Sequence, residues 1–152
     1  MYKSTKLING FSTCFRQWKA NETHCKFLHG YAIEFKIWFE GDIDYRNWVV
    51  DFGVFGRSKH LMNNLTPKEW FKYWFDHTTI IASNDPELEK FKELDNAGLI
   101  QLRQMENVGC EMFAEFVFKN INEWVLKETT RRVRVTKVEC FENKNNTAIY
   151  ER

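Results

Sequence analysis

The sequence lacks the features that mark linkers, repeats and membrane spans. Its 152 residues include only two prolines and seven glycines, and no stretch is rich in Pro, Gly or Ser. There is no internal repeat, no low-complexity segment and no apolar run long enough to span a bilayer. A signal peptide pattern is also missing. These absences predict one domain over residues 1–152 and a cytoplasmic location.

Neither sign of charge is in excess, which argues against a polyanionic partner. The chain has 22 Lys and Arg against 21 Asp and Glu, interspersed along its length, for a formal net charge of +1. This balance gives no electrostatic reason to expect binding to nucleic acid or to a membrane surface. It favours a small molecule or another protein as the partner.

The four cysteines stand at irregular separations, and neither a CxxC nor an HExxH motif accompanies them. This spacing predicts free thiols in a reducing compartment and makes a disulfide framework improbable. Aromatic residues, by contrast, are abundant at 16%, and fourteen of them are Phe. Most should pack in the core, and the rest are candidates for an oligomer interface or a pocket for a flat ligand.

Alternation of apolar and polar residues predicts the strands. The clearest is 31–40, where Ile33, Phe35, Ile37 and Phe39 alternate with mostly charged residues before Gly41 and Asp42 turn the chain. We expect it to form a hairpin-like pair with a first strand over residues 2–15. Further strands are predicted at 78–82, 99–103, 131–141 and 147–150.

Capping signals and apolar stripes predict the helices. Asp51 can cap a helix over 52–63, and the capping box from Thr66 to Glu69 opens another that ends near Phe75. Residues 84–87 should cap a helix that reaches about 94, and an apolar stripe predicts the longest helix over 108–126. The order of elements predicts an α+β domain with helices on one face of a mostly antiparallel sheet.

The first candidate site lies at the mouth of the 31–40 strand. His24, Cys25 and His29 are close together there, and imidazole and thiolate are typical zinc ligands. A Cys beside a His is also the usual activated thiol nucleophile. An equally open interpretation is a surface His beside a half-buried Cys in a loop.

The second candidate is the Asp76-His77 pair. A His oriented by a carboxylate is the usual proton-transfer unit, because its pKa lies near working pH. The alternative is an ordinary polar pair at the exit of a helix.

The order of motifs resembles the 6-pyruvoyltetrahydropterin and 6-carboxytetrahydropterin synthase family. The resemblance starts at Phe11, continues through the Cys-x-x-Leu-His-Gly motif of Cys25 to Gly30, and extends to Tyr150. It implies a tunnelling fold (T-fold), in which subunits join their sheets into trimeric barrels, trimers stack into hexamers, and the sites lie between subunits.

The same resemblance implies roles for individual residues. Cys25, Asp76 and His77 would form a proton-shuttling triad, while Glu142 would grip the pterin, with Glu139 as the neighbouring competitor. A carboxylate suits this task because it accepts two parallel N–H bonds from an aminopyrimidinone edge. Glu111 matches a family glutamate at a helix start. The sequence favours a structural role for Glu111, since an acidic first turn favours the helix dipole, while the resemblance implies contact with the substrate.

The activity implied is that of a zinc-dependent lyase on 7,8-dihydroneopterin triphosphate, whose product could feed deazapurine synthesis such as that of queuosine. The family binds zinc through three histidines, but Phe15 and Tyr31 replace two of them here and leave His29. One histidine cannot hold a catalytic zinc, which needs about three protein ligands.

Loss of the metal is therefore favoured over a site rebuilt with His24, Cys14 or Cys25. Three functions stay open on the sequence: an active lyase, a catalytically silent oligomer that binds a pterin or purine-like base, and an oligomeric scaffold without a ligand.

Overall fold

The computed structural model describes residues 1–60 and 62–152, which form two four-stranded sheets. The first, here called the long sheet, is antiparallel throughout and has the strand order β1-β4-β7-β8. Its strands are β1 (Tyr2–Ile8), β4 (Glu34–Gly41), β7 (Val133–Phe141) and β8 (Thr147–Glu151). The predicted pairing of the first strand with the 31–40 strand is confirmed as β1 against β4.

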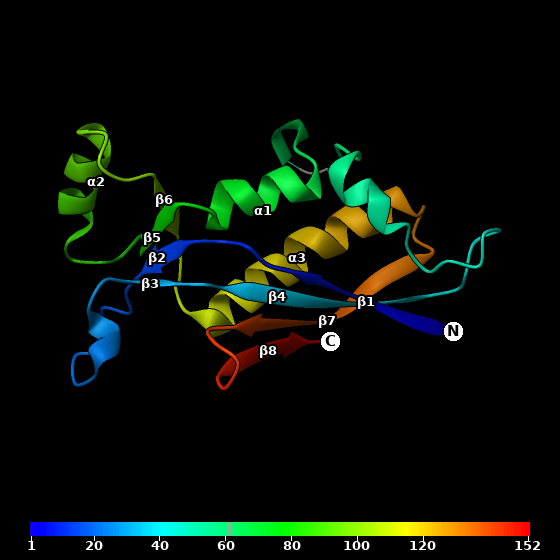
Figure 1. The fold of residues 1–152 in the computed structure, drawn as a ribbon, viewed down its shortest axis with the longest axis horizontal. Helices are drawn as coiled ribbons and strands as arrows, with labels where there is room; N and C mark the ends of the chain where they lie inside the picture. The colour runs from blue at the N-terminus through cyan, green and yellow to red at the C-terminus, as the bar shows by residue number, and fades with distance from the viewer. Residues whose placement is uncertain (61) are drawn as a thin grey trace.

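The alternation in β4 fixes which face of the long sheet is buried. Phe35, Ile37 and Phe39 are fully buried, and their neighbours along the strand are half-buried. Across the ladder to β7, Phe35 lies opposite Cys140 and Ile37 opposite Val138. Helix α3 (Cys110–Glu128) covers this face, as Figure 1 shows. The predicted long helix is thus confirmed, with a shift of two residues at each end.

The second sheet, here called the short sheet, was not expected. Its strands are β3 (His29–Tyr31), β2 (Thr13–Phe15), β5 (Thr78–Ala82) and β6 (Leu102–Met105), in that order. The β2–β3 pair is antiparallel, whereas β2–β5 and β5–β6 are parallel. The prediction of one mostly antiparallel sheet is therefore wrong in this half of the molecule.

The range 2–15 forms two strands instead of one. β1 belongs to the long sheet and β2 to the short sheet, and residues 9–12 connect them. Gly10 has a φ of 89° in this connection, a backbone conformation that glycine adopts without strain. The chain can therefore turn out of one sheet and enter the other.

Two shorter helices complete the fold. Helix α1 (Pro67–Phe75) opens with the predicted capping box, in which the Thr66 hydroxyl accepts from the Glu69 N–H and the Glu69 carboxylate accepts from the Thr66 N–H. Helix α2 (Leu88–Asn96) follows β5. Its N-cap is Glu87, which makes no side-chain capping bond, while Asp85 accepts the Glu87 N–H.

The helix predicted over 52–63 is wrong in extent. Asp51 does cap a helix by accepting the Gly53 N–H, but this is the 3₁₀ helix η2 (Phe52–Gly56). A further 3₁₀ turn, η3, spans Met62–Asn64, and Asn63 within it has non-helical torsion angles. Residue 61 of the predicted range lies outside the described residues.

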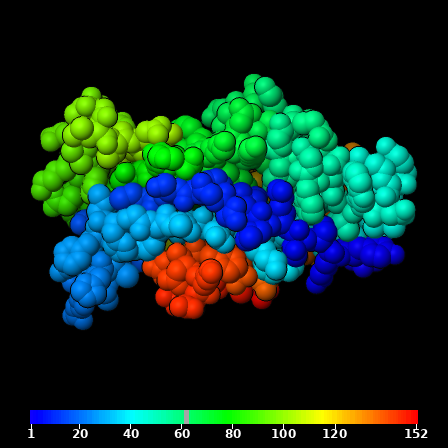
Figure 2. Space-filling view, viewed as in Figure 1, coloured from blue at the N-terminus to red at the C-terminus, as the bar shows by residue number. Residues whose placement is uncertain are grey.

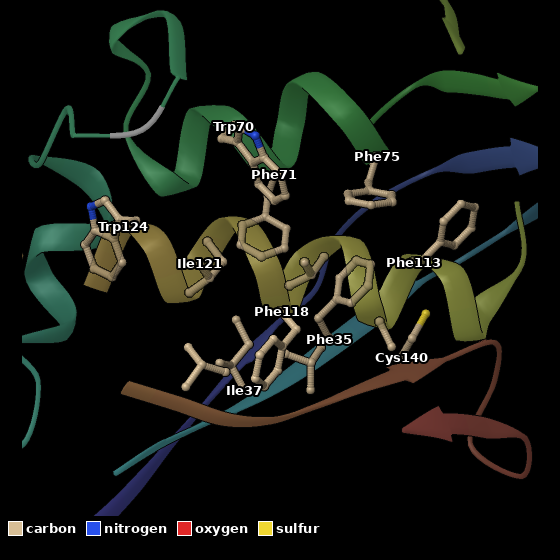
Figure 3. Packing of buried hydrophobic residues seen from close by; sticks show 14 of the residues in the cluster. Phe35, Ile37, Trp70, Phe71, Phe75, Phe113, Phe118, Ile121, Trp124 and Cys140 are labelled. Carbon is tan, nitrogen blue, oxygen red and sulfur yellow. The ribbon is translucent and has the colours of Figure 1, made fainter. Parts of the chain in front are cut away.

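Aromatic rings fill the space between α1, α3 and the long sheet. Phe35 packs against Phe71 and Phe75 of α1, with ring centroids 5.6 and 4.7 Å apart, and Phe75 meets Phe113 of α3 edge-on. Figure 3 shows these rings meeting above β4, with Cys140 pointing from β7 toward α3. The core thus ties the long sheet to both helices.

On the surface, segments from different parts of the chain lie side by side. Figure 2 shows the N-terminal residues as a blue band between the green residues of α1 and α2 and the orange C-terminal hairpin. In the described residues, no helix is both long and apolar enough to cross a membrane.

Candidate functional site

Three candidate site residues from distant parts of the chain line one pocket. Cys25, Glu111 and Glu142 border a cavity of about 210 Å³. Figure 1 shows the segments that carry them at the same end of the molecule: the blue loop between β2 and β3, the start of α3, and the turn between β7 and β8. The other lining residues are Phe15, Gln17, Cys110, Asn146, Thr147 and Ala148.

Glu142 stands at the end of β7, in a tight turn. Its N–H donates to the carbonyl of Asn146 over 3.0 Å, and the Asn143 side chain accepts the N–H groups of Asn145 and Asn146. This network holds the hairpin tip and places the Glu142 side chain at the pocket. The competitor Glu139 instead accepts the Thr147 hydroxyl across the hairpin, 2.9 Å away.

Glu111 enters the pocket from the first turn of α3. The N-cap residue is Gly109, whose φ of 134° suits only glycine. A β-carbon at this position would lie 2.6 Å from the side-chain nitrogen of Gln17. The backbone here therefore permits close approach of the 16–24 loop to the start of α3.

Cys25 is held by the loop that contains it. The Thr23 hydroxyl accepts the Cys25 N–H over 3.1 Å, and the Cys25 carbonyl accepts the Gln17 N–H over 2.8 Å. Cys25 lies in the 3₁₀ turn η1 (His24–Lys26) and is half-buried. His24, in contrast, is exposed.

The side chains of Phe15, His29 and Tyr31 stack beside this pocket. Phe15 lies opposite His29 in the β2–β3 ladder, and Tyr31 is two residues further along β3 on the same face. The Tyr31 ring centroid is 4.3 Å from that of Phe15 and 4.3 Å from that of His29. The Tyr31 hydroxyl and His29 Nε2 are hydrogen bonded at 2.8 Å.

Tyr31 is a neutral phenol at physiological pH. Burial raises its pKa to about 12, and the nearby negative charge of Glu142 acts in the same direction.

The residues at these positions do not fit a catalytic zinc. Phe15 has no donor atom, and a neutral phenol and one imidazole fall short of the three protein ligands that such a site needs. In the part of the chain that the structure describes, no three His, Cys, Asp or Glu side chains are placed to share a metal ion. His24, Cys25 and His29 are thus not gathered into a joint ligand set.

Two further thiols lie under the pocket. Cys110 lines it, and Cys140 is fully buried on β7. Burial raises the pKa of the Cys140 thiol well above its ordinary value, and its hydrogen bond with Cys110 adds to the effect. Cys140 is therefore a neutral thiol outside the pocket lining, whereas Cys25 and Cys110 both line the pocket.

The Asp76-His77 pair forms a real hydrogen-bonded unit at a different place. His77 Nδ1 is 3.0 Å from Asp76 Oδ1, which also accepts the Ser12 N–H. His77 has a φ of 56° and donates its N–H to the Ser12 carbonyl over 2.7 Å, while its side chain remains largely exposed. Neither residue lines the pocket of Cys25 and Glu142.

Sequence reasoning missed part of the pocket. Gln17 and Asn146 line it without any motif that would have signalled them. Tyr150, at the end of the stretch that carries the resemblance, is absent from the lining and packs its ring 5.0 Å from Phe118 of α3. Tyr150 is partly buried and packs against the hydrophobic core.

Comparisons with known proteins bear on the family and the fold. The model of the 6-pyruvoyl tetrahydropterin synthase family matches residues 5–152. Among solved structures, the uncharacterised protein WS1659 from Wolinella succinogenes is similar with a TM-score of 0.78 and 17% identity, over 99% of this chain and 97% of that one.

Two synthases share the same fold. The 6-pyruvoyl tetrahydropterin synthase of Plasmodium vivax has a TM-score of 0.65 and 14% identity, over 100% of this chain and 99% of that one. The enzyme of Caenorhabditis elegans has a TM-score of 0.61 and 18% identity, over 99% of this chain and 95% of that one. No curated protein matches the chain. The expected α+β tunnelling fold is confirmed by these likenesses.

Proposed function

Because the chain belongs to the 6-pyruvoyl tetrahydropterin synthase family, we propose that it is a pterin-processing lyase. Its proposed substrate is 7,8-dihydroneopterin triphosphate, and its product is a 6-carboxy- or 6-pyruvoyl-tetrahydropterin. The observation that carries the proposal is the convergence of Cys25, Glu111 and Glu142 on one pocket from three distant segments.

The two carboxylates supply the recognition. A pterin presents an amino group and a ring N–H side by side on its pyrimidinone edge, and a carboxylate can accept both hydrogen bonds at once. Glu142 is proposed for this bidentate contact, since the hairpin tip fixes it at the pocket. Glu111 supports the same edge from the first turn of α3.

The thiol supplies the base. Cys25 is proposed to remove a proton from the ligand's side chain, and the electron pair left on carbon forms a double bond as the bond to the triphosphate oxygen breaks. This elimination leads to the 6-pyruvoyl product, whereas the 6-carboxy product also requires cleavage of the bond next to the first side-chain carbon, with the outer carbons leaving as acetaldehyde. The Asp76-His77 pair is proposed to return a proton during the following tautomerisation.

The separation of the two catalytic groups supports a site shared between subunits. His77 is exposed and held in a left-handed backbone conformation, which costs about 1–3 kcal/mol and is typical of functional positions. A neighbouring chain in a homo-oligomer, a trimer or hexamer, is proposed to bring its own Asp76 and His77 to the Cys25 pocket.

The Phe15–Tyr31 pair supports a second candidate, a ligand-binding oligomer without turnover. A zinc-free site lacks a Lewis acid for the carbanion-like intermediate, and such a group contributes several kcal/mol to barrier lowering. Binding through Glu142 would be kept, because it depends on a different part of the pocket.

Calorimetric titration with 7,8-dihydroneopterin tests the recognition. Glu142→Gln should weaken binding by about 10- to 100-fold. The amide keeps one acceptor oxygen, so one charge-assisted hydrogen bond is lost and one N–H group of the pterin is left desolvated without a partner. Glu139→Gln is the matched control on the same strand and should bind like the wild type. Equal affinity for Glu142→Gln and wild type contradicts the assignment.

Turnover of the triphosphate, followed by chromatography of the pterin products, separates the two candidates. Cys25→Ala and His77→Ala should each abolish turnover, and mixed oligomers of the two variants should recover part of it, because some sites then hold both intact groups. Ligand binding with no turnover in the wild type would favour the second candidate. If the wild type shows neither binding nor turnover, the remaining function is the oligomeric scaffold without a ligand.

A further inference from the structure

We infer that Phe15, His29 and Tyr31 form a metal-free proton-donor subsite on a backbone that still has the geometry of a three-ligand metal site. The first part of this inference concerns the free protein and does not depend on the proposed function. The second part, that the subsite contacts the ligand, rests on the proposed function.

The backbone gathers the three side chains at one point. Phe15 and His29 are direct partners in the β2–β3 ladder, and Tyr31 follows on the same face. The Tyr31 ring lies 4.3 Å from each of the other two, centroid to centroid. Three imidazoles at these positions would therefore reach a common ion, whereas the residues present provide one imidazole, one phenol and one ring without a donor.

The His29–Tyr31 pair leaves one proton free for a ligand. A neutral imidazole has one N–H and a phenol has one O–H, which gives the pair two donor protons. Their mutual hydrogen bond at 2.8 Å uses one of them. If His29 Nε2 donates, the Tyr31 hydroxyl proton is free, and if Tyr31 donates, the Nδ1 proton of His29 is free.

This free donor is placed beside the candidate pocket. Phe15 lines the pocket, and Tyr31 stacks directly on Phe15. His29 and Tyr31 are not themselves in the lining, so contact requires that a pterin whose edge is held by Glu142 extend its side chain toward this stack. The subsite would then donate a hydrogen bond to a side-chain hydroxyl or carbonyl oxygen, the atoms that a Lewis acid would otherwise bind.

Zinc binding tests the first part. After equilibrium dialysis against micromolar zinc, elemental analysis should find no stoichiometric metal in the wild type and about one ion per chain in F15H/Y31H, because three histidines complete a zinc site. Adding His29→Ala to the double variant should remove the metal. Two results would overturn the inference. One is stoichiometric zinc in the wild type that is lost in His29→Ala, and the other is a folded F15H/Y31H variant that binds no zinc.

Phe15 is buried, so the double variant carries a risk to folding. Tyr31→His alone leaves Phe15 in place and supplies two imidazoles. It should bind zinc more tightly than the wild type and more weakly than a folded double variant. Affinity equal to that of the wild type would overturn the retained geometry.

Paired ligands test the second part. Tyr31→Phe removes the proton that is free when His29 donates, and His29→Ala removes the one that is free when Tyr31 donates. One of the two variants should therefore weaken binding of 7,8-dihydroneopterin by about 2- to 12-fold, the net value of one hydrogen bond. Binding of 6-methyl-7,8-dihydropterin, which has no side-chain hydroxyl, should not change in that variant. Equal weakening of both ligands, or no weakening of 7,8-dihydroneopterin in either variant, would overturn the proton-donor role. If the wild type binds neither ligand, the proposed function fails, and with it the ligand contact, while the zinc measurement still decides the first part.

Discussion

The long sheet and the short sheet are stabilised by different interactions. The long sheet buries an apolar face under α3, and fully buried aliphatic and aromatic side chains connect the layers. The short sheet has strands of three to five residues, and several of its links to the rest of the chain are polar. The Thr13 hydroxyl donates to the Phe75 carbonyl over 2.6 Å, and Arg16 pairs with the buried Asp85.

The candidate site follows this division. Cys25, the Phe15–His29–Tyr31 cluster and the Asp76-His77 pair all lie on or beside the short sheet, while Glu111 and Glu142 come from the ends of α3 and β7. Both sheets contribute to the apolar core, since Phe15 and Ile80 of the short sheet belong to it, and the short sheet adds polar links at its margin, where most of the candidate residues lie.

The largest effect is expected in the long sheet. Phe35→Ala removes a ring that packs against Phe71 and Phe75, and it should lower the free energy of unfolding by about 3–5 kcal/mol. Urea denaturation followed by circular dichroism measures the change. Leu99→Ala, at an exposed site, is the control and should change the free energy by less than about 0.5 kcal/mol. A small effect of Phe35→Ala would contradict the view that the apolar face of the long sheet is the main source of stability.

Asp85→Asn should cost about 3 kcal/mol, because it leaves the partly buried Arg16 without its charged partner. Arg16 binds both carboxylate oxygens at 2.8 Å, so the pair is bidentate. Glu89→Gln removes half of an exposed ion pair with Lys92 and should have almost no effect. Equal effects of the two variants would contradict the importance of the buried pair.

The effect of Asp85→Asn should also depend on pH. Burial raises the pKa of Asp85, but the hydrogen bonds from Arg16 and from the Glu87 N–H outweigh it and lower the pKa below its ordinary value of 3.8. The pKa of this carboxyl group is lower in the folded protein than in the unfolded one. Its ionised form therefore stabilises the fold fully at a pH above its pKa in the unfolded protein, and the stabilisation is lost as the pH falls through its pKa in the folded protein. The difference between wild type and variant should therefore be full near neutral pH and shrink below about pH 4. A difference that does not change with pH would contradict the assignment.

The smallest effect concerns the start of α1. Thr66→Ala removes the hydroxyl that accepts the Glu69 N–H and should lower the free energy of unfolding by about 1 kcal/mol. Thr66→Ser keeps the acceptor and should restore most of the loss. A variant pair with identical stability would show that the capping box contributes little beyond the packing of Phe71 and Phe75.

Local patterns in the sequence predicted much of the long sheet and its helices. The alternation in β4, the capping box of α1 and the apolar stripe of α3 are signals that depend on neighbouring residues only. In the short sheet, β5 was predicted correctly and β6 nearly so, but β2 and β3 were not recognised as separate strands, because three residues are too few for a period to be seen. Their pairing into a second sheet was not predicted either. The helix over 52–63 failed for a similar reason, since a cap at Asp51 does not determine how far a helix continues.

The candidate site was only partly predictable. A resemblance of ordered motifs pointed to Cys25, Glu111 and Glu142, and the structure brings them to one pocket. It could not indicate Gln17 or Asn146, or that Tyr150 faces α3. These depend on contacts between residues far apart in the chain, and no spacing records them.

The sequence by itself determined the α+β composition, the buried face of the longest strands, and the absence of an imidazole at Phe15 and Tyr31. These properties follow from side-chain chemistry and from periods within one element. Only the tertiary structure decided that the chain splits into two sheets after β1, that the Phe15, His29 and Tyr31 side chains close into a hydrogen-bonded stack, and that Asp76 and His77 lie outside the Cys25 pocket. The physical reason is that strand pairing and side-chain convergence depend on packing among all layers at once, which no single segment specifies.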